Sequence, residues 1–421
     1  MNRLQNVMTR PDRVPFAAIA VLFAGGLVLA GPIDPPAGPV GSTYKTLTEI
    51  EPRTMVNAAN TPGDADSVFR ITQPGSYYLT DNVTGVVGKH GIEIAARATL
   101  DLNGFQVVGV PGSLDGVRIL AVPAHVLNGG IRQWSGNGVS ATTGGSEGCT
   151  FVGVRSHNNI ATGFNVSPPS CLFSNCSAID NSGVGFSSGT GARFDRCVSN
   201  DNAAGGIFAA QGSTLRSCTV FANLSFGIAV GPACSVTDCS TNYNESDGVN
   251  ASTGCTISDC SAMFNNGNGI TGSTGVNIQG CTAYGNQLGI DVSSSCIVEG
   301  CSVVANVLDG IQCTSSCVVR NNISSINANG IELGAGIHAL GSNNRIESNN
   351  CTSNDFGIDI DAAGNVIIRN TCANNGSNFL IVANNIYGTI ADRSAVVSPL
   401  IAGDAGTGTM GSTDPNANFA Y

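Results

Sequence analysis

The chain has 421 residues, and its charge is sparse and predominantly acidic. Only 11% of the residues are charged, the formal net charge is −11 at pH 7 and the sequence pI is about 4.7. Because nucleic acid and anionic membrane surfaces recruit lysine and arginine, this composition argues against both as partners.

The first 30 residues are typical of a secretory signal peptide. Arg3, Arg10 and Arg13 precede a run at 14–30 that is nearly all apolar and short for a membrane span. Residues 1–30 therefore predict export to the periplasm, the cell surface or the medium, with an uncleaved anchor as the alternative. We expect no stable membrane span in the mature chain.

Residues 31–68 predict a Pro- and Gly-rich leader followed by an N-terminal cap over the first strands. From residue 69 onward, short apolar segments alternate with turn residues. A Pro-Gly turn joins two expected strands within 69–79, and further short strands are expected at 91–94 and 116–119.

One phrase then recurs, with a step of 20 to 22 residues from Gly163 to Gly330: Cys-x-Val-x-x-Cys-x-x-x-x-Asn-x-x-x-Gly-Ile-x-Val. A fixed period of this size indicates a solenoid. Leucine-rich repeats need more leucine, and helical repeats need about 33 residues or more. The content of Val, Ile, Thr, Ser and Asn and the alternating Gly-Ile-x-Val segment favour short strands. The glycines of the phrase are Gly138, Gly163, Gly185, Gly206, Gly227, Gly248, Gly269, Gly289, Gly310, Gly330 and Gly357.

The period and composition predict an all-β fold, a parallel β-helix over residues 69–385 with a C-terminal tail at 386–421. The strings Pro-Gly-Ser-Tyr-Tyr-Leu at 74–79 and Leu-Asp-Leu-Asn-Gly-Phe at 100–105, followed by the Asn-x-x-x-Gly-Ile coils, resemble exported right-handed parallel β-helix proteins of the pectate-lyase-like superfamily. The resemblance implies a single-stranded, right-handed coil. It also implies a range of functions that includes polysaccharide lyases, glycoside hydrolases, adhesins, tailspikes and copper-site maturation factors.

The chemistry of that superfamily is not evident in the sequence. The strings typical of polygalacturonases and of the best-known pectate lyases do not occur, and Met and His are too scattered for a copper-handling role. The favoured function is therefore binding of polysaccharide or cell-envelope material. A polysaccharide lyase or glycoside hydrolase with a non-standard carboxylate site is the alternative.

Residues at the same position of the phrase on successive coils form a column along the expected solenoid. The sixteen cysteines fall mainly in two such columns, and a third column, from Asn159 to Asn375, is asparagine. Coils stacked about 4.8 Å apart hold neighbouring Cβ atoms beyond the separation that a disulfide needs. We therefore expect buried, mostly reduced thiols that pack as small apolar groups, with occasional bridges as the alternative. The asparagines are expected to bond along the stack.

The outward residue of Gly-Ile-x-Val changes from neutral to acidic along the chain. Glu332 and Asp359 are expected on successive coils, about 5 Å apart, with Asp361 pointing the same way. Close carboxylates raise a pKa or recruit a hard cation. The pattern predicts a calcium site at Asp291, Glu332, Asp359 and Asp361, or an acid/base site at Glu332 and Asp359. A solvated acidic face is the alternative.

Two further features are candidates for function. The step from Gly330 to Gly357 is 27 residues, which predicts a loop within 334–344 beside the acids, with His338 as a proton carrier. Arg132 and Trp134 could form a sugar-stacking edge, with an ordinary half-buried tryptophan as the alternative.

Overall fold

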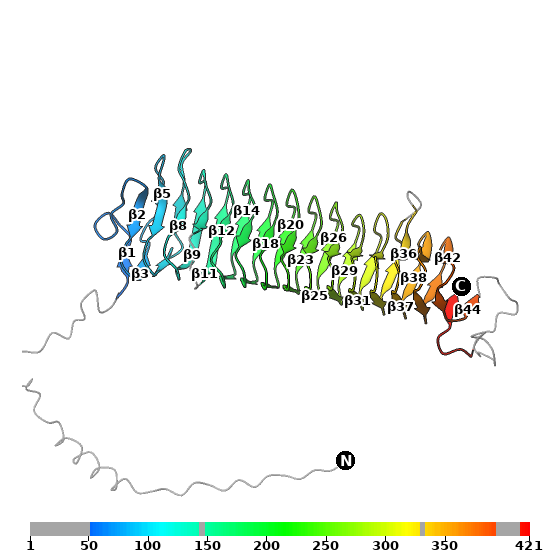
Figure 1. Cartoon of the computed structure of the whole chain (residues 1–421). Helices are drawn as coiled ribbons and strands as arrows, with labels where there is room; N and C mark the ends of the chain where they lie inside the picture. Colours follow the sequence, from blue (N-terminus) through cyan, green and yellow to red (C-terminus); the bar gives the residue numbers. More distant parts are fainter. Residues whose placement is uncertain (1–50, 143–147, 329–332, 393–412) are drawn as a thin grey trace, which may run out of the picture. The chain divides into compact units, whose positions relative to one another are not determined.

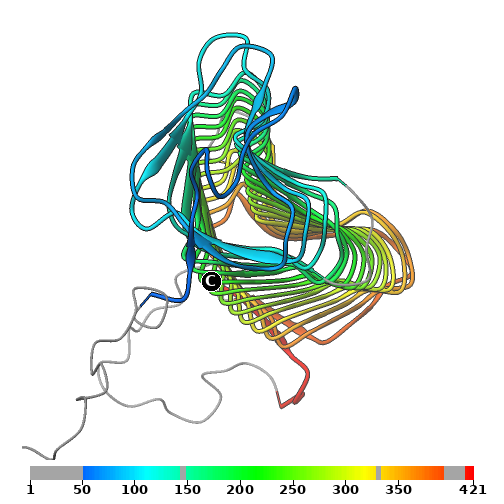
Figure 2. The ribbon, with the colours of Figure 1, turned by 90° about the vertical axis from the view of Figure 1, so that its left-hand side faces the viewer.

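The computed structural model describes residues 51–142, 148–328, 333–392 and 413–421, and Arg53–Tyr421 form one compact unit. The described chain winds into a solenoid whose coils stack from the N-terminal to the C-terminal end (Figure 1). Viewed along its axis, the solenoid has an L-shaped section (Figure 2). No helix occurs in the described ranges, and every pairing between their named strands is parallel. The predicted all-β, single-stranded parallel β-helix is confirmed.

The Gly-Ile-x-Val segments that the structure describes lie in a sheet that holds 15 strands within the described residues. These strands are β2 (Ser67–Ile71), β5 (His90–Ile94), β8 (Val117–Ile119), β10 (Val139–Ala141), β12 (Phe164–Val166), β15 (Phe186–Ser188), β18 (Ile207–Ala209), β21 (Ile228–Val230), β24 (Val249–Ala251), β27 (Ile270–Gly272), β30 (Ile290–Val292), β33 (Ile311–Cys313), β36 (Ala335–Ala339), β39 (Phe356–Ile360) and β42 (Ser377–Ile381).

The second sheet holds 30 strands in the same ranges and receives two strands, or one long strand, from most coils. One row contains β1 (Thr54–Met55), β3 (Gly75–Tyr78), β6 (Ala98–Asp101), β9 (His125–Arg132), β11 (Thr150–His157), β13 (Leu172–Ser174), β16 (Arg193–Asp195), β19 (Thr214–Arg216), β22 (Ser235–Thr237), β25 (Thr256–Ser258), β28 (Asn277–Gln279), β31 (Ile297–Glu299), β34 (Val318–Arg320), β37 (Arg345–Glu347), β40 (Val366–Ile368) and β43 (Ile386–Tyr387). The other contains β4 (Val83–Thr84), β7 (Gln106–Val108), β14 (Ser177–Ile179), β17 (Val198–Asn200), β20 (Thr219–Phe221), β23 (Ser240–Asn242), β26 (Ser261–Met263), β29 (Thr282–Tyr284), β32 (Ser302–Val304), β35 (Ile323–Ser325), β38 (Asn350–Thr352), β41 (Thr371–Ala373), β44 (Ile390–Asp392) and β45 (Asn418–Ala420).

The repeated glycine is required by the close stacking of the coils. Gly227 lies directly under the next coil, and a Cβ atom added to it would lie 2.5 Å from the carbonyl oxygen of Gly248. The strand that follows alternates inward and outward: Ile228 and Val230 are buried, whereas Ala229 is half-exposed. One continuous apolar core results from this alternation.

The asparagine column forms a hydrogen-bonded ladder, as predicted. The Nδ2 atom of Asn223 donates to Oδ1 of Asn244 on the next coil at 3.0 Å, and the main-chain N–H of Asn223 donates to the same oxygen at 3.1 Å. The side-chain bond recurs between successive members from Asn159 to Asn375, at 2.9 to 3.2 Å. The ladder satisfies buried polar groups at one corner of every coil.

All sixteen cysteines are buried and unbridged, which agrees with the prediction. Burial raises the pKa of the Cys176 thiol to about 11. Where one cysteine column ends, asparagine replaces it: Cys301 N–H donates to Asn322 Oδ1, and Asn322 begins a second ladder that continues through Asn349 and Asn370 to Asn418.

The C-terminal residues contribute more to the solenoid than the sequence predicted. The segment 386–421 was expected to be a tail, but β43, β44 and β45 belong to the 30-stranded sheet. At the other end, β1 pairs with β3, so part of the expected cap at 31–68 adds a strand to the first coils. The proposed signal peptide lies outside the described residues.

Candidate functional site

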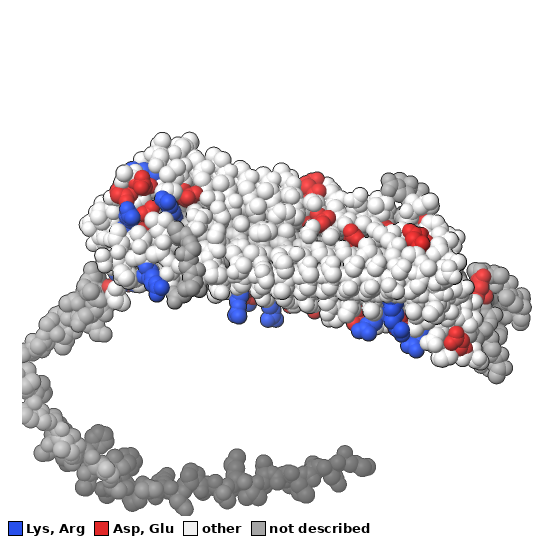
Figure 3. Space-filling model, viewed as in Figure 1, with Lys and Arg blue, Asp and Glu red and all other residues white. Residues whose placement is uncertain are grey.

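The outward side chains of the 15-stranded sheet form one column, which we call the outer strip. Figure 3 shows a mixed acidic and basic patch at the N-terminal end of the face that this sheet presents, an uncharged stretch, and acidic residues toward the C-terminal end. The strip consists of Arg70, Glu93, Arg118, Ser140, Asn165, Ser187, Phe208, Ala229, Asn250, Thr271, Asp291, Gln312, His338, Asp359 and Leu380.

The structure corrects the predicted position of Glu332. Ile311 pairs with Ile337, which places His338 in the outer strip where Glu332 was expected, and Glu332 itself lies outside the described residues. Two Gly-Ile segments compete for this position, and the second is used because it keeps the 21-residue step to the glycine of the next coil. In the first register Leu333 would point inward, but it is 80% exposed.

The additional residues of the longer coil come earlier in the chain than predicted. Residues 335–339 form strand β36, so the expected loop at 334–344 is not there; the additional residues lie between Asn327 and β36. His338 is part of a strand and needs no bent loop to reach the acids.

His338 lies among three carboxylates. Its Nδ1 atom is 3.0 Å from Oδ2 of Asp309, and its Nε2 atom is 3.0 Å from Oδ2 of Asp361 and 3.8 Å from Oδ2 of Asp359. Asp309 is buried, and its Oδ1 atom accepts the main-chain N–H of Ala335 at 2.6 Å. We call Asp309, His338, Asp359 and Asp361 the His338 cluster.

The carboxylates determine the charge of His338. Burial opposes its protonation, but the hydrogen bonds to Asp309 and Asp361 and the charge of Asp359 outweigh that effect and raise its pKa to about 9. Burial raises the pKa of Asp359, and the nearby Asp361 and Asp309 raise it further against the opposing effect of His338. At neutral pH the cluster therefore holds an imidazolium among carboxylates.

One oxygen of the cluster lacks a hydrogen bond. Oδ1 of Asp359 is shielded from solvent and accepts no hydrogen bond from the residues that the structure describes, although the side chain as a whole is 13% exposed. A shielded carboxylate oxygen without a donor is costly unless another group satisfies it.

The four predicted calcium ligands are not brought together. Asp359 and Asp361 are neighbours, but Asp291 is two coils before His338, with Gln312 between them. Asp291 belongs to another network, in which Asn268 Nδ2 donates to it at 3.4 Å. Burial raises the pKa of Asp291, and the nearby Asp247 and Asp309 add to that effect.

The N-terminal end of the outer strip holds a second charged group that the sequence analysis did not identify. Glu93 is buried between two arginines: its Oε1 atom is 3.0 Å from Nε of Arg70, and its Oε2 atom is 3.4 Å from a guanidinium nitrogen of Arg118. Arg70 also pairs with Asp64. Both arginines are thus neutralised by carboxylates of the chain.

The proposed sugar-stacking edge is wrong. Trp134 is fully buried, and its Nε1 atom donates to the carbonyl oxygen of Val107 at 3.0 Å. Its ring occupies space that glycines leave free, since a Cβ atom on Gly91 would lie 2.8 Å from it. Arg132 donates to Gln133 at 2.7 Å. It ends β9 in the 30-stranded sheet, whereas Asp359 lies in the 15-stranded sheet many coils further along the stack, so the two do not belong to one site.

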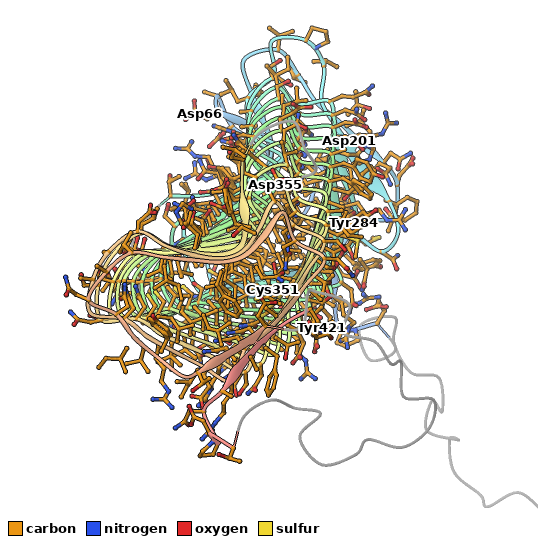
Figure 4. The ribbon with its side chains drawn as sticks, turned by 90° about the vertical axis from the view of Figure 1, so that its right-hand side faces the viewer. Asp66, Asp201, Tyr284, Cys351, Asp355 and Tyr421 are labelled. Atoms are coloured by element: carbon orange, nitrogen blue, oxygen red, sulfur yellow. The ribbon has the colours of Figure 1, made fainter. Side chains whose placement is uncertain are left out.

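An exposed aromatic ladder runs along the other sheet. The rings of Phe221, Tyr243, Phe264 and Tyr284 follow one another on four coils, with centroids 5.1 to 5.4 Å apart. Figure 4 shows Tyr284 on the opposite side of the coil from Asp66, which precedes β2 of the 15-stranded sheet. The rings cover one another in part, and Tyr284 is 38% exposed.

Two family profiles match consecutive parts of the solenoid. The profile of the right-handed β-helix region matches residues 90–254, and that of the periplasmic copper-binding protein (NosD) matches residues 229–391. No curated protein matches the sequence significantly. The part of the chain that the structure describes has no helix both long and apolar enough to cross a bilayer.

Several solved structures are similar at low sequence identity. The A-module of the Azotobacter vinelandii mannuronan C-5 epimerase AlgE6 is 14% identical over 83% of this chain and 91% of its own, with a TM-score of 0.43. The periplasmic alginate epimerase AlgG is 12% identical over 74% and 78%, with a TM-score of 0.39, and the pectate lyase Pel9A is 16% identical over 65% and 64%, with a TM-score of 0.33. These similarities assign neither an activity nor a substrate.

The repeat, the parallel sheets and the first family profile agree with one another, and the chain is a right-handed parallel β-helix protein.

Proposed function

We propose that this protein is exported and binds an extended, uncharged polysaccharide along the middle of the outer strip. The observation that supports this most directly is the run of uncharged, solvent-accessible outward residues over six consecutive coils: Asn165, Ser187, Phe208, Ala229, Asn250 and Thr271. At about 4.8 Å per coil, this run is about 24 Å long, which suits an extended ligand better than a small molecule.

The chemistry of the run suits sugar hydroxyls. Among the described residues, the side chains of Asn165 and Ser187 form no hydrogen bond, so their amide and hydroxyl groups are available. Phe208 is 42% exposed between Ser187 and Ala229, and these small neighbours leave its ring accessible for contact with a sugar face.

Charge favours a neutral ligand over an acidic one. At the N-terminal end of the strip, Arg70 and Arg118 are already paired with Glu93. At the other end, the His338 cluster contains three carboxyl groups and one imidazole, and the whole chain carries a net −11. A polyanionic glycan would therefore approach against an unfavourable field.

Binding is tested by affinity electrophoresis in gels that contain either a neutral glucan or a polyuronate. We expect retardation by the neutral glucan, and Phe208→Ala should remove most of it. Tyr284→Ala is the matched control, since it removes an exposed ring from the 30-stranded sheet and should leave retardation unchanged. Stronger retardation by the polyuronate, or loss of binding in Tyr284→Ala alone, would contradict the proposal.

Export has its own support. Residues 1–30 have the pattern of a signal peptide, and one matching family is described as periplasmic. Fractionation of cells followed by N-terminal sequencing should find the mature protein outside the cytoplasm with its first residue near Gly31. A cytoplasmic protein that retains Met1 would contradict export without bearing on glycan binding.

Acid–base cleavage of a polysaccharide is the second candidate function, and the raised pKa of Asp359 beside His338 favours it. Incubation with the bound glycan should then release new reducing ends, and Asp359→Asn should abolish release while retardation persists. If the wild-type protein binds the glycan and releases no ends, the function is binding alone.

A further inference from the structure

The C-terminal end of the outer strip brings together three potential metal ligands of two kinds. His338 lies on β36, Asp359 lies beside it on β39, and Asp361 follows β39. One ligand atom from each, the imidazole nitrogen and two carboxylate oxygens, lie within 4.8 Å of one another. The Nε2 atom is 3.0 Å from the nearer carboxylate and 3.8 Å from the other, which is close to the separation of ligand atoms around one small ion.

A carboxylate contacts the His338 ring on the side opposite the potential ligand atom Nε2, as is common for metal-binding histidines. Its Nδ1 atom faces buried Asp309, whose other oxygen is fixed by the N–H of Ala335. With Nδ1–H donating to Asp309, displacement of the Nε2 proton by a metal ion would leave the Nε2 lone pair directed at Asp359 and Asp361. A carboxylate behind a metal-binding histidine fixes the tautomer and orientation of the ring in this way.

A separate observation concerns Asp359. Its Oδ1 atom is shielded from solvent and has no hydrogen-bond donor among the described residues, so one oxygen of this carboxylate lacks a partner, while its Oδ2 atom is 3.8 Å from Nε2 of His338. Ion pairing with His338 alone does not explain this, because His338 reaches the other oxygen, Oδ2. Coordination of a cation by the carboxylate would offset the cost of shielding it.

From this geometry we infer that His338, Asp359 and Asp361 bind a divalent transition-metal ion of the Zn²⁺ class, with Asp309 as the group that positions the histidine. The imidazole ligand decides the class of ion, because Ca²⁺ takes oxygen ligands, whereas imidazole with carboxylates suits Zn²⁺ and its neighbours in the transition series. Three protein ligands leave a coordination position open for water or a ligand. The inference is independent of glycan binding.

Zn²⁺ is the probe, since Cu²⁺ binds most nitrogen and oxygen sites more tightly and discriminates less. Calorimetric titration of the chelator-treated, full-length chain at pH 7.5 should show one tight Zn²⁺ site, and Zn²⁺ should raise the melting temperature by linkage. Ca²⁺ at the same concentration should do neither. His338→Gln and Asp361→Asn should each abolish the tight site. Asp309→Asn should weaken it about 10- to 100-fold without removing it.

Adventitious binding is controlled with another histidine. His157 is half-buried at the end of β11 in the 30-stranded sheet, and His157→Gln should bind Zn²⁺ like the wild-type protein. Circular dichroism verifies that each variant is folded. Retention of the tight site in His338→Gln, its loss in His157→Gln, or an equal response to Ca²⁺ and Zn²⁺ would overturn the inference.

Discussion

Replacement of Asn244 by alanine tests the asparagine ladder at its centre. Oδ1 of Asn244 accepts the main-chain N–H of Asn223 at 3.1 Å and its Nδ2 at 3.0 Å, and Nδ2 of Asn244 donates to Asn265 at 2.9 Å. The substitution removes these three bonds. The Nδ2 group of Asn223 keeps its bond to the carbonyl oxygen of Ser199, but the main-chain N–H of Asn223 loses its acceptor.

The magnitude follows from these contacts. Three hydrogen bonds contribute about 0.5–1.5 kcal/mol each, and a buried donor left unsatisfied costs about 1–3 kcal/mol more. We therefore expect Asn244→Ala to lower the free energy of unfolding by about 2.5–7.5 kcal/mol. Asn266→Ala is the control, because that exposed side chain bonds only to Glu245 among the described residues and should change the free energy by less than about 0.5 kcal/mol.

Urea denaturation followed by circular dichroism measures both effects, provided that both variants unfold in one transition with the slope of the wild-type protein. A loss below about 1 kcal/mol in Asn244→Ala, or equal losses in both variants, would refute the idea that the ladder stabilises the stack rather than merely filling a corner.

Three further outcomes are expected. Deletion of residues 228–248, one period of 21 residues, should leave a folded solenoid by circular dichroism, whereas deletion of 228–237 should not, because only the first keeps every column in register. Thiol labelling should be slow in the native protein and fast in denaturant, and Cys239→Ala should cost about 1–3 kcal/mol in urea denaturation through the lost contacts and the cavity; quantitative disulfides would contradict this. With chelator present, the raised pKa of His338 predicts a stabilising contribution of about 3 kcal/mol that is complete below pH 6.5 and is lost as the pH rises through about 9. The difference in stability between wild type and His338→Gln, measured by denaturation from pH 6 to 10, should shrink accordingly.

The fold could be predicted because the constraints on each coil are local and repeated. A glycine at Gly227 is required by the carbonyl oxygen of Gly248 one coil away, and the same contact recurs along the sheet, so the requirement appears in the sequence at a fixed interval. The asparagine ladder could be predicted for the same reason, because its hydrogen bond also recurs once in every coil. Two Gly-Ile segments, at Gly330 and Gly336, fit the phrase equally well, so the local pattern does not show which one forms the strand. Only the 21-residue spacing from Gly336 to Gly357 distinguishes them.

The candidate site was only partly predictable, because its members come from different positions of the repeat. Asp359 lies in the outward column, but Asp309 precedes the glycine, at a position that the alternation of a strand does not assign to either face. Asp247 occupies the equivalent position and bonds to Thr271 of the outer strip at 3.0 Å, which is a signal that the sequence contained. The burial of Trp134 depends on space left by glycines of preceding coils, which no local pattern reveals.

The asparagine ladder also has a direction. Every amide from Asn159 to Asn354 donates from Nδ2 to the Oδ1 atom of the following coil, so these amide dipoles point the same way and polarise one another. The oxygen end, at Asn159, receives the N–H of Trp134, and the amino end, at Asn375, donates to Asn378 and to the carbonyl oxygen of Cys351. The solenoid thus contains an electric axis parallel to its length, with its positive pole at the C-terminal coils, where the carboxylates of the outer strip are concentrated.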